Sequence, residues 1–425
     1  MRVLREGSAG PAVQLLQLAL NRAGFGALET DGIFGAATRA ALQKFQRSRG
    51  LVSDGIAGPL SHRRLLPWYT GYLVRRLVPG DTLWTLSQRY GVEIAAIELA
   101  NPGLVPENLR VGSELVIPLP FPVVPVEIDY SSALVNYCVR GLAARYPFLR
   151  TGEFGKSVMG RPLWMLQLGE GGNRVLYNAS HHANEWITTP LLLRFVETLA
   201  EAFAAGERIA GYSAAEILDY ATLTIVPALN VDGIDLVTGE LQQGDFYANA
   251  RRIAAAYPRF PFPSGWKANI RGTDLNLQYP AGWEQAKEIK AAQGVRSPAP
   301  ADYVGSAPLS APESRALADL TRREMPDLTL SYHSQGEVIY WRFLNEAPPG
   351  AEAIAALFGR VSGYAVEDVP YASGFAGYKD WFVQDFGRPG YTIEVGRGVN
   401  PLPLAQFPRI WEANLPILTL AALVT

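Results

Sequence analysis

The first part of the chain alternates apolar and polar residues with the period of a helix. A helix over residues 37–45 is indicated by apolar residues at i, i+3, i+4 and i+8, namely Ala37, Ala40, Ala41 and Phe45. An earlier helix over residues 13–20 is predicted to stop at Gly24. The sequence Asp-Gly-Ile-Phe-Gly at 31–35 recurs as Asp-Gly-Ile-Ala-Gly at 54–58, each time before a helical start. These patterns predict a small α-helical bundle with Asp-Gly turns over residues 1–67.

A different pattern follows over residues 71–119. A short strand at 72–74 and a turn at 79–81 precede a helix that begins after Thr82 and stops at Gly91. A second helix is predicted to end at Asn101, and a closing strand spans 114–117. The order is strand, helix, helix, strand. The proline-rich stretch 118–125 is then a stiff, extended bridge and marks the last domain boundary.

From residue 126 to 425 strands alternate with longer helices, which predicts a large α/β domain with a parallel or mixed sheet. Four apolar runs in it lead into polar residues. The runs are 175–178, 223–226, 328–332 and 390–393, and the polar residues after them are His182 with Glu185, Asn230, His333 and Glu394. Because ligands of open α/β folds bind outside the carboxyl ends of strands, we expect these side chains to line one catalytic crevice.

Composition narrows the function classes. The 425 residues predict several domains, and 48% hydrophobic with 18% charged residues is typical of a soluble globular protein. A formal charge of -2 gives no reason to expect binding to nucleic acid, and no apolar run is long enough to insert into a membrane. The single cysteine, Cys138, excludes an internal disulfide and a multi-cysteine metal site.

Histidine and glutamate therefore remain as ligands for a metal. A catalytic zinc ion takes three protein ligands and leaves a position open for water. The chain has four histidines, of which His62 lies in the helical N-terminal part, so His182, Glu185 and the distant His333 are predicted to hold one zinc ion. The alternative is that the adjacent histidines only cap the following helix and that Glu185 is a solvated acid of its first turn.

Both N-terminal segments resemble known wall-binding modules. Residues 1–67, with Asp31-Gly32-Ile33-Phe34-Gly35 and Asp54-Gly55-Ile56-Ala57-Gly58-Pro59, resemble the small helical peptidoglycan-binding domain. Residues 71–119 resemble a lysin-motif domain through Pro79-Gly80-Asp81-Thr82-Leu83-Trp84, Leu99-Ala100-Asn101-Pro102 and Gly112-Ser113-Glu114-Leu115-Val116-Ile117-Pro118. The resemblance implies binding to the N-acetylglucosamine-containing glycan of cell walls.

Residues 130–420 resemble the zinc carboxypeptidase family. The matching motifs are His182-x-x-Glu185, Asn230-Val231-Asp232-Gly233, Gly272-Thr273-Asp274-Leu275-Asn276, Ser331-Tyr332-His333-Ser334 and Tyr391-Thr392-Ile393-Glu394-Val395. The resemblance implies the family's fold, one bound zinc ion and a catalytic role for Glu394. The alternative is that Glu394 is a structural acid on a buried strand. The pair Trp266-Lys267 aligns with the family's Trp-Arg pair, which implies that Lys267 stabilises the oxyanion, with Arg271 as the open alternative.

The sequence departs from the family at substrate-binding positions. The family follows its Asp-x-Asn run with an arginine that clamps the free carboxylate of a C-terminus, whereas Leu277 follows Asn276 here and has no donor. Tyr371 is the candidate for the substrate-covering tyrosine, although its spacing to the next motif is one residue short. Lys379, before Asp380-Trp381, aligns with the specificity pocket and would favour an anionic group, unless it is a solvated surface lysine. Asn276, Tyr371 and Lys379 are thus the substrate-binding candidates.

The combination of wall-binding modules, a zinc peptidase and no C-terminal clamp resembles the γ-D-glutamyl-L-diamino acid endopeptidases. The resemblance implies cleavage of the bond between γ-D-glutamate and meso-diaminopimelate in peptidoglycan stem peptides. Two alternatives remain: a wall-anchored zinc carboxypeptidase of ordinary peptides, and a wall-binding protein without activity. We expect association with the cell wall or spore, and because no signal peptide is recognisable, release or a non-standard export route.

Overall fold

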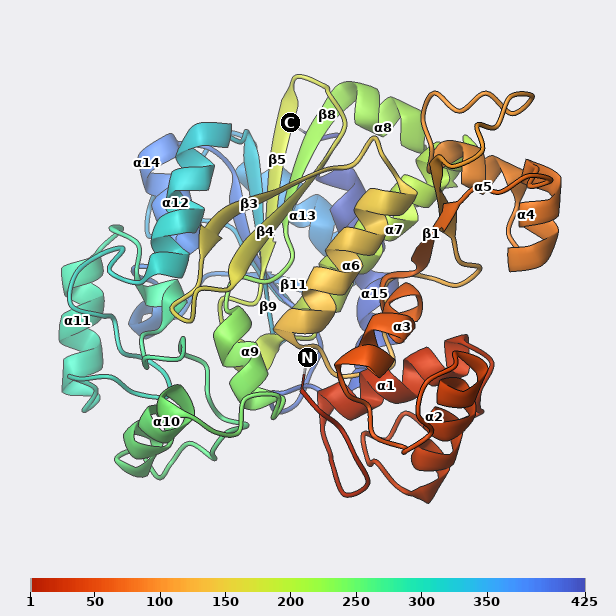
Figure 1. Cartoon of the computed structure of the whole chain (residues 1–425). Helices are drawn as coiled ribbons and strands as arrows, with labels where there is room; N and C mark the ends of the chain where they lie inside the picture. Colours follow the sequence, from red (N-terminus) through yellow and green to blue (C-terminus); the bar gives the residue numbers. More distant parts are fainter. Residues whose placement is uncertain (1, 425) are drawn as a thin grey trace. The chain divides into compact units, whose positions relative to one another are not determined.

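The computed structural model describes residues 2–424 (Figure 1). Its contacts divide the chain into two compact units. The smaller unit comprises Met1–Asp129 and Ala133–Arg150, and the larger comprises Tyr130–Ser132 and Thr151–Thr425. Each unit is described by itself below.

Three helices form the first part of the smaller unit: α1 (Pro11–Arg22), α2 (Ala36–Ser48) and α3 (Pro59–Thr70). The repeated Asp-Gly sequence has a structural cause. In the first copy the Gln17 side chain donates to the Asp31 carboxylate at 2.8 Å and accepts from the Gly32 N–H at 2.9 Å. In the second copy Gln46 makes the corresponding bonds to Asp54 at 2.9 Å and Gly55 at 3.0 Å. Both turns are therefore fixed by a buried glutamine, and the predicted helical bundle is confirmed.

The next part is a βααβ module made of β1 (Tyr72–Arg76), α4 (Leu83–Tyr90), α5 (Ile94–Leu99) and β2 (Glu114–Pro118). The two strands pair antiparallel. Helix α4 begins with a capping box in which the Thr82 hydroxyl accepts from the Thr85 N–H. Leu86, Ile97 and Ile117 are completely buried in the core between the helices and the strands. The predicted lysin-motif-like order is confirmed.

Helix α6 (Ser132–Arg145) follows the proline-rich bridge, and its residues from Ala133 onward group with the smaller unit. The buried Arg145 guanidinium donates to the backbone carbonyls of Gly71, Leu119 and Phe121 at 2.7–3.1 Å. This helix is thus tied to both ends of the βααβ module. The three boundaries at 1–67, 71–119 and 126–425 stay predictions, because the contacts define only two units.

The larger unit contains one eight-stranded sheet of order β11-β10-β12-β9-β5-β8-β4-β3. Its strands are β3 (Arg150–Lys156), β4 (Pro162–Leu168), β5 (Asn173–Ala179), β8 (Ala221–Val226), β9 (Leu328–His333), β10 (Val338–Tyr340), β11 (Ala365–Glu367) and β12 (Gly390–Glu394). The central strands β12, β9, β5 and β8 run parallel, whereas β10 and β4 pair antiparallel with β12 and β8. The predicted mixed sheet of an α/β domain is confirmed.

Nine α-helices accompany the described part of this sheet: α7 (Thr188–Ala205), α8 (Ala214–Tyr220), α9 (Val231–Val237), α10 (Asp245–Ala255), α11 (Trp283–Ala292), α12 (Pro312–Glu324), α13 (Ala351–Ser362), α14 (Tyr378–Phe386) and α15 (Phe407–Leu420). Helix α7 packs against β5 and α15, and α14 packs against β9 and β12. Over residues 2–424 we find no helix with the length and apolarity needed to span a bilayer.

The strand register brings the polar residues predicted from the sequence to one edge of the sheet. In the parallel pair β9 and β12, His333 lies directly beside Glu394. In the pair β5 and β9, Ala179 lies beside Tyr332, so the segment after β5 leaves the sheet next to His333. The pairing of three neighbouring strands thus fixes the relative positions of His333 and Glu394. It also fixes the point at which the segment that carries His182 leaves the sheet.

The turn between β4 and β5 provides a stability test. A Cβ atom at Gly171 would lie 1.9 Å from the Tyr220 carbonyl carbon and 2.2 Å from the Ala221 nitrogen, whereas at Gly172 nothing lies within 4 Å. Because backbone atoms cannot move aside as a side chain can, Gly171→Ala should lower the free energy of unfolding of the larger unit by about 1–3 kcal/mol. Chemical denaturation followed by tryptophan fluorescence measures this, with Gly172→Ala as the matched control. Equal stability of the two variants would contradict the close approach.

Candidate metal centre

The segment after β5 carries two of the predicted ligands. Ser180 has a left-handed backbone (φ 56°), and its hydroxyl contacts the Thr188 and Thr189 hydroxyls at 2.9 Å each, so the chain turns sharply here. His182 is the N-cap of the short 3-10 helix η1 (Ala183–Glu185), which contains Glu185. This one-turn helix brings both side chains to the same side.

His182, Glu185 and His333 converge on one point. Their candidate ligand atoms all lie within 4.8 Å of one another. The Glu185 carboxylate is 2.9 Å from His182 Nδ1 through one oxygen and 2.9 Å from His333 Nδ1 through the other. The two Nδ1 atoms are 3.3 Å apart. Two imidazole nitrogens and a carboxylate oxygen at this separation fit the donor set of a zinc site.

Asp274 orients the first histidine. Its carboxylate lies 3.1 Å from His182 Nε2 and also accepts from the Asn276 and Asp302 N–H groups at 3.1 Å. A proton on Nε2 leaves Nδ1 free to bind a metal, the usual carboxylate–histidine–metal arrangement. Burial disfavours charge on His182, but Glu185 and Asp274 raise its pKa to about 9. The same negative surroundings favour a bound metal cation.

The other two histidines have different partners. His181 is fully buried, and its Nε2 contacts the Tyr279 hydroxyl at 3.0 Å. Burial, followed by the neighbouring His333 and His182, lowers the pKa of His181 well below its usual value. His62 lies in the smaller unit, between the Tyr69 hydroxyl at 2.9 Å and the Arg2 carbonyl at 3.0 Å. Neither belongs to the group of converging ligand atoms.

Lys267 also reaches this group. Its ammonium lies 3.0 Å from the Glu185 oxygen that faces His182. Burial opposes the charge, but Glu185 and then Asp274 raise the pKa of Lys267 above its ordinary value, so the side chain stays cationic.

A buried asparagine holds the Lys267 segment against the ligand segment. The Asn230 amide donates to the carbonyls of His181, Lys267 and Ala268 at 3.0–3.2 Å. The Ala183 N–H adds a bond to the Lys267 carbonyl at 2.9 Å. Asn230 therefore fixes the relative position of two segments that each contribute a charged group to the site.

Glu394 faces the same cavity from the end of β12. Within residues 2–424 its carboxylate has no hydrogen-bond or salt-bridge partner. Burial, with a smaller contribution from Glu185, raises the pKa of Glu394 to about 8, while Lys267 and His182 act in the opposite direction. A carboxylate without a partner beside a metal-ligand group has the properties of a general base.

A cavity of about 450 Å³ joins these residues. His182, His333, Lys267, Glu394, Asn276, Leu277 and Lys379 all line it. Asn276 has a structural bond as well, since its side-chain oxygen accepts from the Tyr378 N–H at 3.0 Å at the start of α14. Leu277 also lines the cavity, at the position where the zinc carboxypeptidase family carries the arginine that binds a C-terminal carboxylate.

Two predicted site residues lie elsewhere. Arg271 lines a separate cavity that shares no lining residue with the first. Tyr371 is 66% exposed and packs edge-on against Phe375 at 5.0 Å. It lines a small adjoining cavity together with Lys379 and Asp380. The structure therefore does not bring Arg271 or Tyr371 into the cavity of the candidate metal centre.

Sequence reasoning did not select four charged residues that line the cavity: Asp274, Lys290, Asp302 and Asp380. Asp274 was within a recognised motif, and its position two residues before Asn276 was the signal that could have identified it. Lys290, on α11, pairs with the Asp302 carboxylate at 2.7 Å, and both line the cavity. No local pattern marks this pair, because the two residues meet only through the fold.

Comparison with protein families gives three matches. Residues 135–417 match the family described as zinc carboxypeptidase, residues 9–65 match the putative peptidoglycan binding domain, and residues 76–118 match the LysM domain. The last two matches indicate association with the cell wall.

Individual relatives agree with these matches. The gamma-D-glutamyl-L-diamino acid endopeptidase 1 of Lysinibacillus sphaericus is 39% identical over 80% of this chain and 97% of its own length. The uncharacterized protein YqgT of Bacillus subtilis is 33% identical over 79% of this chain and 86% of its own. Among solved structures, bovine thrombin-activatable fibrinolysis inhibitor matches with a TM-score of 0.54 at 20% identity, over 70% of this chain and 97% of that one, which shows a shared fold.

The contact between Asp274 and His182 can be tested through the metal itself. Asp274→Asn keeps the shape but removes the charge and one acceptor, so zinc affinity should fall by about 10–100-fold. Competition with a chromophoric chelator measures the affinity without using activity. Asp245→Asn removes an exposed carboxylate that does not line this cavity and should leave the affinity unchanged. An unaltered affinity in Asp274→Asn would mean that the carboxylate does not support the ligand.

Proposed function

This chain is a zinc metallopeptidase of the zinc carboxypeptidase family, and we propose that it is a peptidoglycan hydrolase that cuts the bond between γ-D-glutamate and meso-diaminopimelate in stem peptides. The relative from Lysinibacillus sphaericus is named for cleavage at a γ-D-glutamyl-L-diamino acid bond. Its similarity extends over most of both chains, which supports extending that specificity to this protein.

One observation carries the proposal, and it concerns the cavity of about 450 Å³ lined by His182 and His333, called the metal cavity below. None of the described residues that line the metal cavity is an arginine. An enzyme that removes C-terminal residues needs a fixed donor for the terminal carboxylate, and a bidentate guanidinium is the best suited group. Leu277 lies in this cavity and offers no hydrogen-bond donor. The cavity is therefore poorly suited to general trimming of peptides from their C-terminus.

The charged groups in the cavity complement diaminopimelate. Lys290 pairs with Asp302, and Lys379 pairs with Asp380 while donating to the Arg342 carbonyl. All four side chains line the cavity, and both lysines are more than nine-tenths buried. The distal end of meso-diaminopimelate carries one ammonium and one carboxylate, so a lysine and aspartate pair offers an opposite charge to each. We propose that these two pairs recognise that zwitterionic end.

Residues in the cavity would divide the chemistry between them. His182, Glu185 and His333 would hold one zinc ion, which when bound acidifies water and polarises the scissile carbonyl. Glu394 would accept the proton of the attacking water and pass it to the leaving amine.

Lys267 is the proposed oxyanion donor. Its ammonium lies beside Glu185 in the cavity, where a developing negative charge would need compensation. Arg271 lines the other cavity, which argues against it for this role. Tyr371 stays a substrate-binding prediction, and it lies at the adjoining small cavity, which shares Lys379 and Asp380 with the larger one.

The N-terminal domains would keep the enzyme on its polymer. We propose that residues 1–67 and 71–119 bind the wall glycan while residues 126–425 cut the stem peptides. Tethering of this kind raises the local substrate concentration without a new contact in the catalytic site. A location at the cell wall or spore follows from this proposal.

A digest of purified peptidoglycan tests the function. The full chain loaded with zinc should release fragments that begin with diaminopimelate, identified by mass spectrometry, and should cut stems with lysine at that position more slowly. Glu394→Gln should lower turnover by a factor of at least about 10² while still binding zinc, because general-base catalysis contributes about 10²–10⁴-fold.

Two results would oppose this reading. Removal of C-terminal residues from ordinary peptides at comparable rates would favour a wall-anchored carboxypeptidase. Full turnover by Glu394→Gln would remove the glutamate from the mechanism. Addition and removal of a chelator in the same digest separates zinc-dependent cleavage from contaminating hydrolases.

The two oxyanion candidates can be separated directly. Lys267→Met should lower kcat on the soluble tripeptide L-alanyl-γ-D-glutamyl-diaminopimelate by about 10²–10³-fold, because it removes the donor beside Glu185. Arg271→Met should leave kcat on this substrate within about twofold of the original chain. Steady-state kinetics, with zinc content measured in parallel, gives kcat for both variants. A larger loss of kcat in Arg271→Met than in Lys267→Met would assign the oxyanion role to Arg271.

A further inference from the structure

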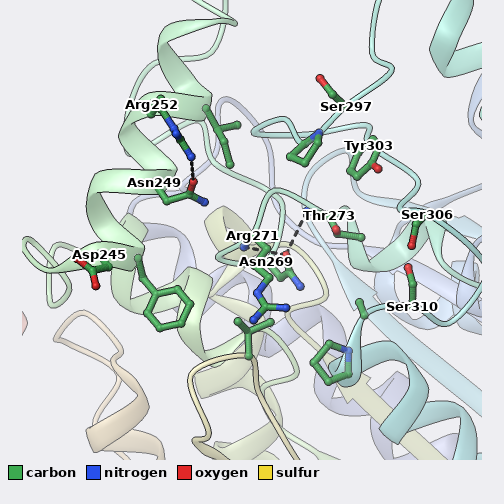
Figure 2. Close-up of a pocket in the computed structure, with 16 residues that line it drawn as sticks. Asp245, Asn249, Arg252, Asn269, Arg271, Thr273, Ser297, Tyr303, Ser306 and Ser310 are labelled. Atoms are coloured by element: carbon green, nitrogen blue, oxygen red, sulfur yellow. Dashed lines mark hydrogen bonds between the residues drawn. The ribbon is translucent and has the colours of Figure 1, made fainter.

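The larger unit contains a second cavity that the proposed chemistry does not use. Its volume is about 760 Å³, within the range of sites that enclose a small ligand (Figure 2). Ten of its lining residues are polar or charged: Asp245, Asn249, Arg252, Asn269, Arg271, Thr273, Ser297, Tyr303, Ser306 and Ser310. It is therefore a cavity with many hydrogen-bonding groups.

The segment 267–274 forms the wall between the two cavities. Lys267 and Asp274 line the metal cavity, whereas Asn269, Arg271 and Thr273 line the second one. Because residues of one short loop line both cavities, the two cavities lie close to each other. A large polymeric substrate can occupy both.

The floor of the second cavity is rigid. The side-chain oxygen of Asn269 accepts from the Arg271 and Thr273 N–H groups at 3.1 Å each. The Asn269 amide donates to the buried Glu313 carboxylate at 3.2 Å, which accepts from the Val158 N–H at 2.9 Å. These bonds fix the backbone that carries Arg271, so the cavity is preformed.

The cavity carries positive charge without a matching anion. Among the described residues neither Arg252 nor Arg271 forms a salt bridge with a carboxylate. Arg252 donates only to the Asn249 side chain, at 2.6 Å, and the Arg271 guanidinium reaches into the middle of the cavity (Figure 2). Asp245 is the one acid among the described lining residues. Two guanidinium forks and several hydroxyls suit a carboxylate ligand.

We propose that this cavity binds a carboxylate of a stem peptide other than the one being cut, as found on the neighbouring stem of cross-linked peptidoglycan. The inference rests on the proposed function for the nature of the polymer. Wall glycan is the weaker candidate, because N-acetylglucosamine is uncharged and the lactyl carboxyl of N-acetylmuramate is blocked by an amide bond wherever it carries a stem peptide, so the glycan would leave both guanidiniums without a counter-charge. Stem peptides carry free carboxylates and supply it.

Kinetics with three soluble substrates test the assignment. They are the tripeptide L-alanyl-γ-D-glutamyl-diaminopimelate, the disaccharide-tripeptide, and a cross-linked dimer of two disaccharide-peptides. For the full chain carrying Arg252→Gln and Arg271→Gln we expect KM for the dimer to rise about tenfold with kcat unchanged, and both smaller substrates to change less than twofold. Arg251→Gln, an exposed arginine on the same helix outside the cavity, is the matched control and should alter none of them.

Each other outcome overturns the inference. An unchanged KM for the dimer removes the cavity from substrate binding. An equal rise for dimer and disaccharide-tripeptide assigns the cavity to glycan, and an equal rise for all three assigns it to the stem being cut. The thermal melting temperature of the double variant, expected to be unchanged, shows whether a loss comes from misfolding.

A binding measurement separates this inference from the proposed function. Calorimetric titration of the dimer into the full chain carrying Glu394→Gln, with and without the two arginine substitutions, needs no turnover. A tenfold loss of affinity for the dimer in the chain with the two arginine substitutions supports carboxylate binding in the second cavity. This holds even if the enzyme without these substitutions cuts none of the three substrates, and then only the proposed function fails. Equal affinities overturn the inference whether or not cleavage occurs.

Discussion

The structure around the site depends on the buried carboxylate of Glu185. Glu185 is 1% exposed, and its two carboxylate oxygens contact the imidazoles of His182 and His333. The Lys267 ammonium forms an ion pair with this carboxylate, and the Ser334 N–H donates a hydrogen bond to it. An isolated carboxylate at this depth would cost several kcal/mol of desolvation. Each surrounding group therefore has a stabilising role before any chemistry occurs, and the two imidazoles together with Glu185 itself are the candidate donor set for zinc.

Meeting this requirement involves segments far apart in the chain. The strand register sets His333 beside Glu394, and the side chain of Asn230 joins the carbonyls of the two loops that carry His182 and Lys267. Asn230 is fully buried, so loss of its amide would leave carbonyl groups unpaired in the interior. The geometry of the candidate site is thus a consequence of sheet pairing and of one buried amide.

The segment 267–274 lies between the two cavities of the larger unit. One side of it contributes Lys267 and Asp274 to the metal cavity, and the other contributes Arg271 to the polar cavity. Lys267 and Arg271, which were alternative oxyanion donors in the sequence, therefore have different surroundings. The metal cavity would hold the bond to be cut, and its neighbour would select the polymer that carries it.

Several features could be predicted from the sequence because they are local or rare. Helical and strand periodicity gave the bundle, the βααβ module and the mixed sheet, and the scarcity of histidine limited the ligand set to His182, Glu185 and His333. Short motifs carry such information because the hydrogen bonds and turns they form involve near neighbours, as in the Asp-Gly turns held by Gln17 and Gln46.

Only the tertiary structure decided which charged side chains share a cavity. Lys290 meets Asp302 across a loop, Lys379 is neutralised by Asp380, and Arg271 faces away from the metal centre although Lys267, four residues earlier, faces it. Side-chain direction in an irregular loop depends on bonds such as those from Asn269 to Glu313, which connect distant parts of the chain. The sequence by itself determined the candidate metal ligands, and the packing of loops on the sheet decided what surrounds them.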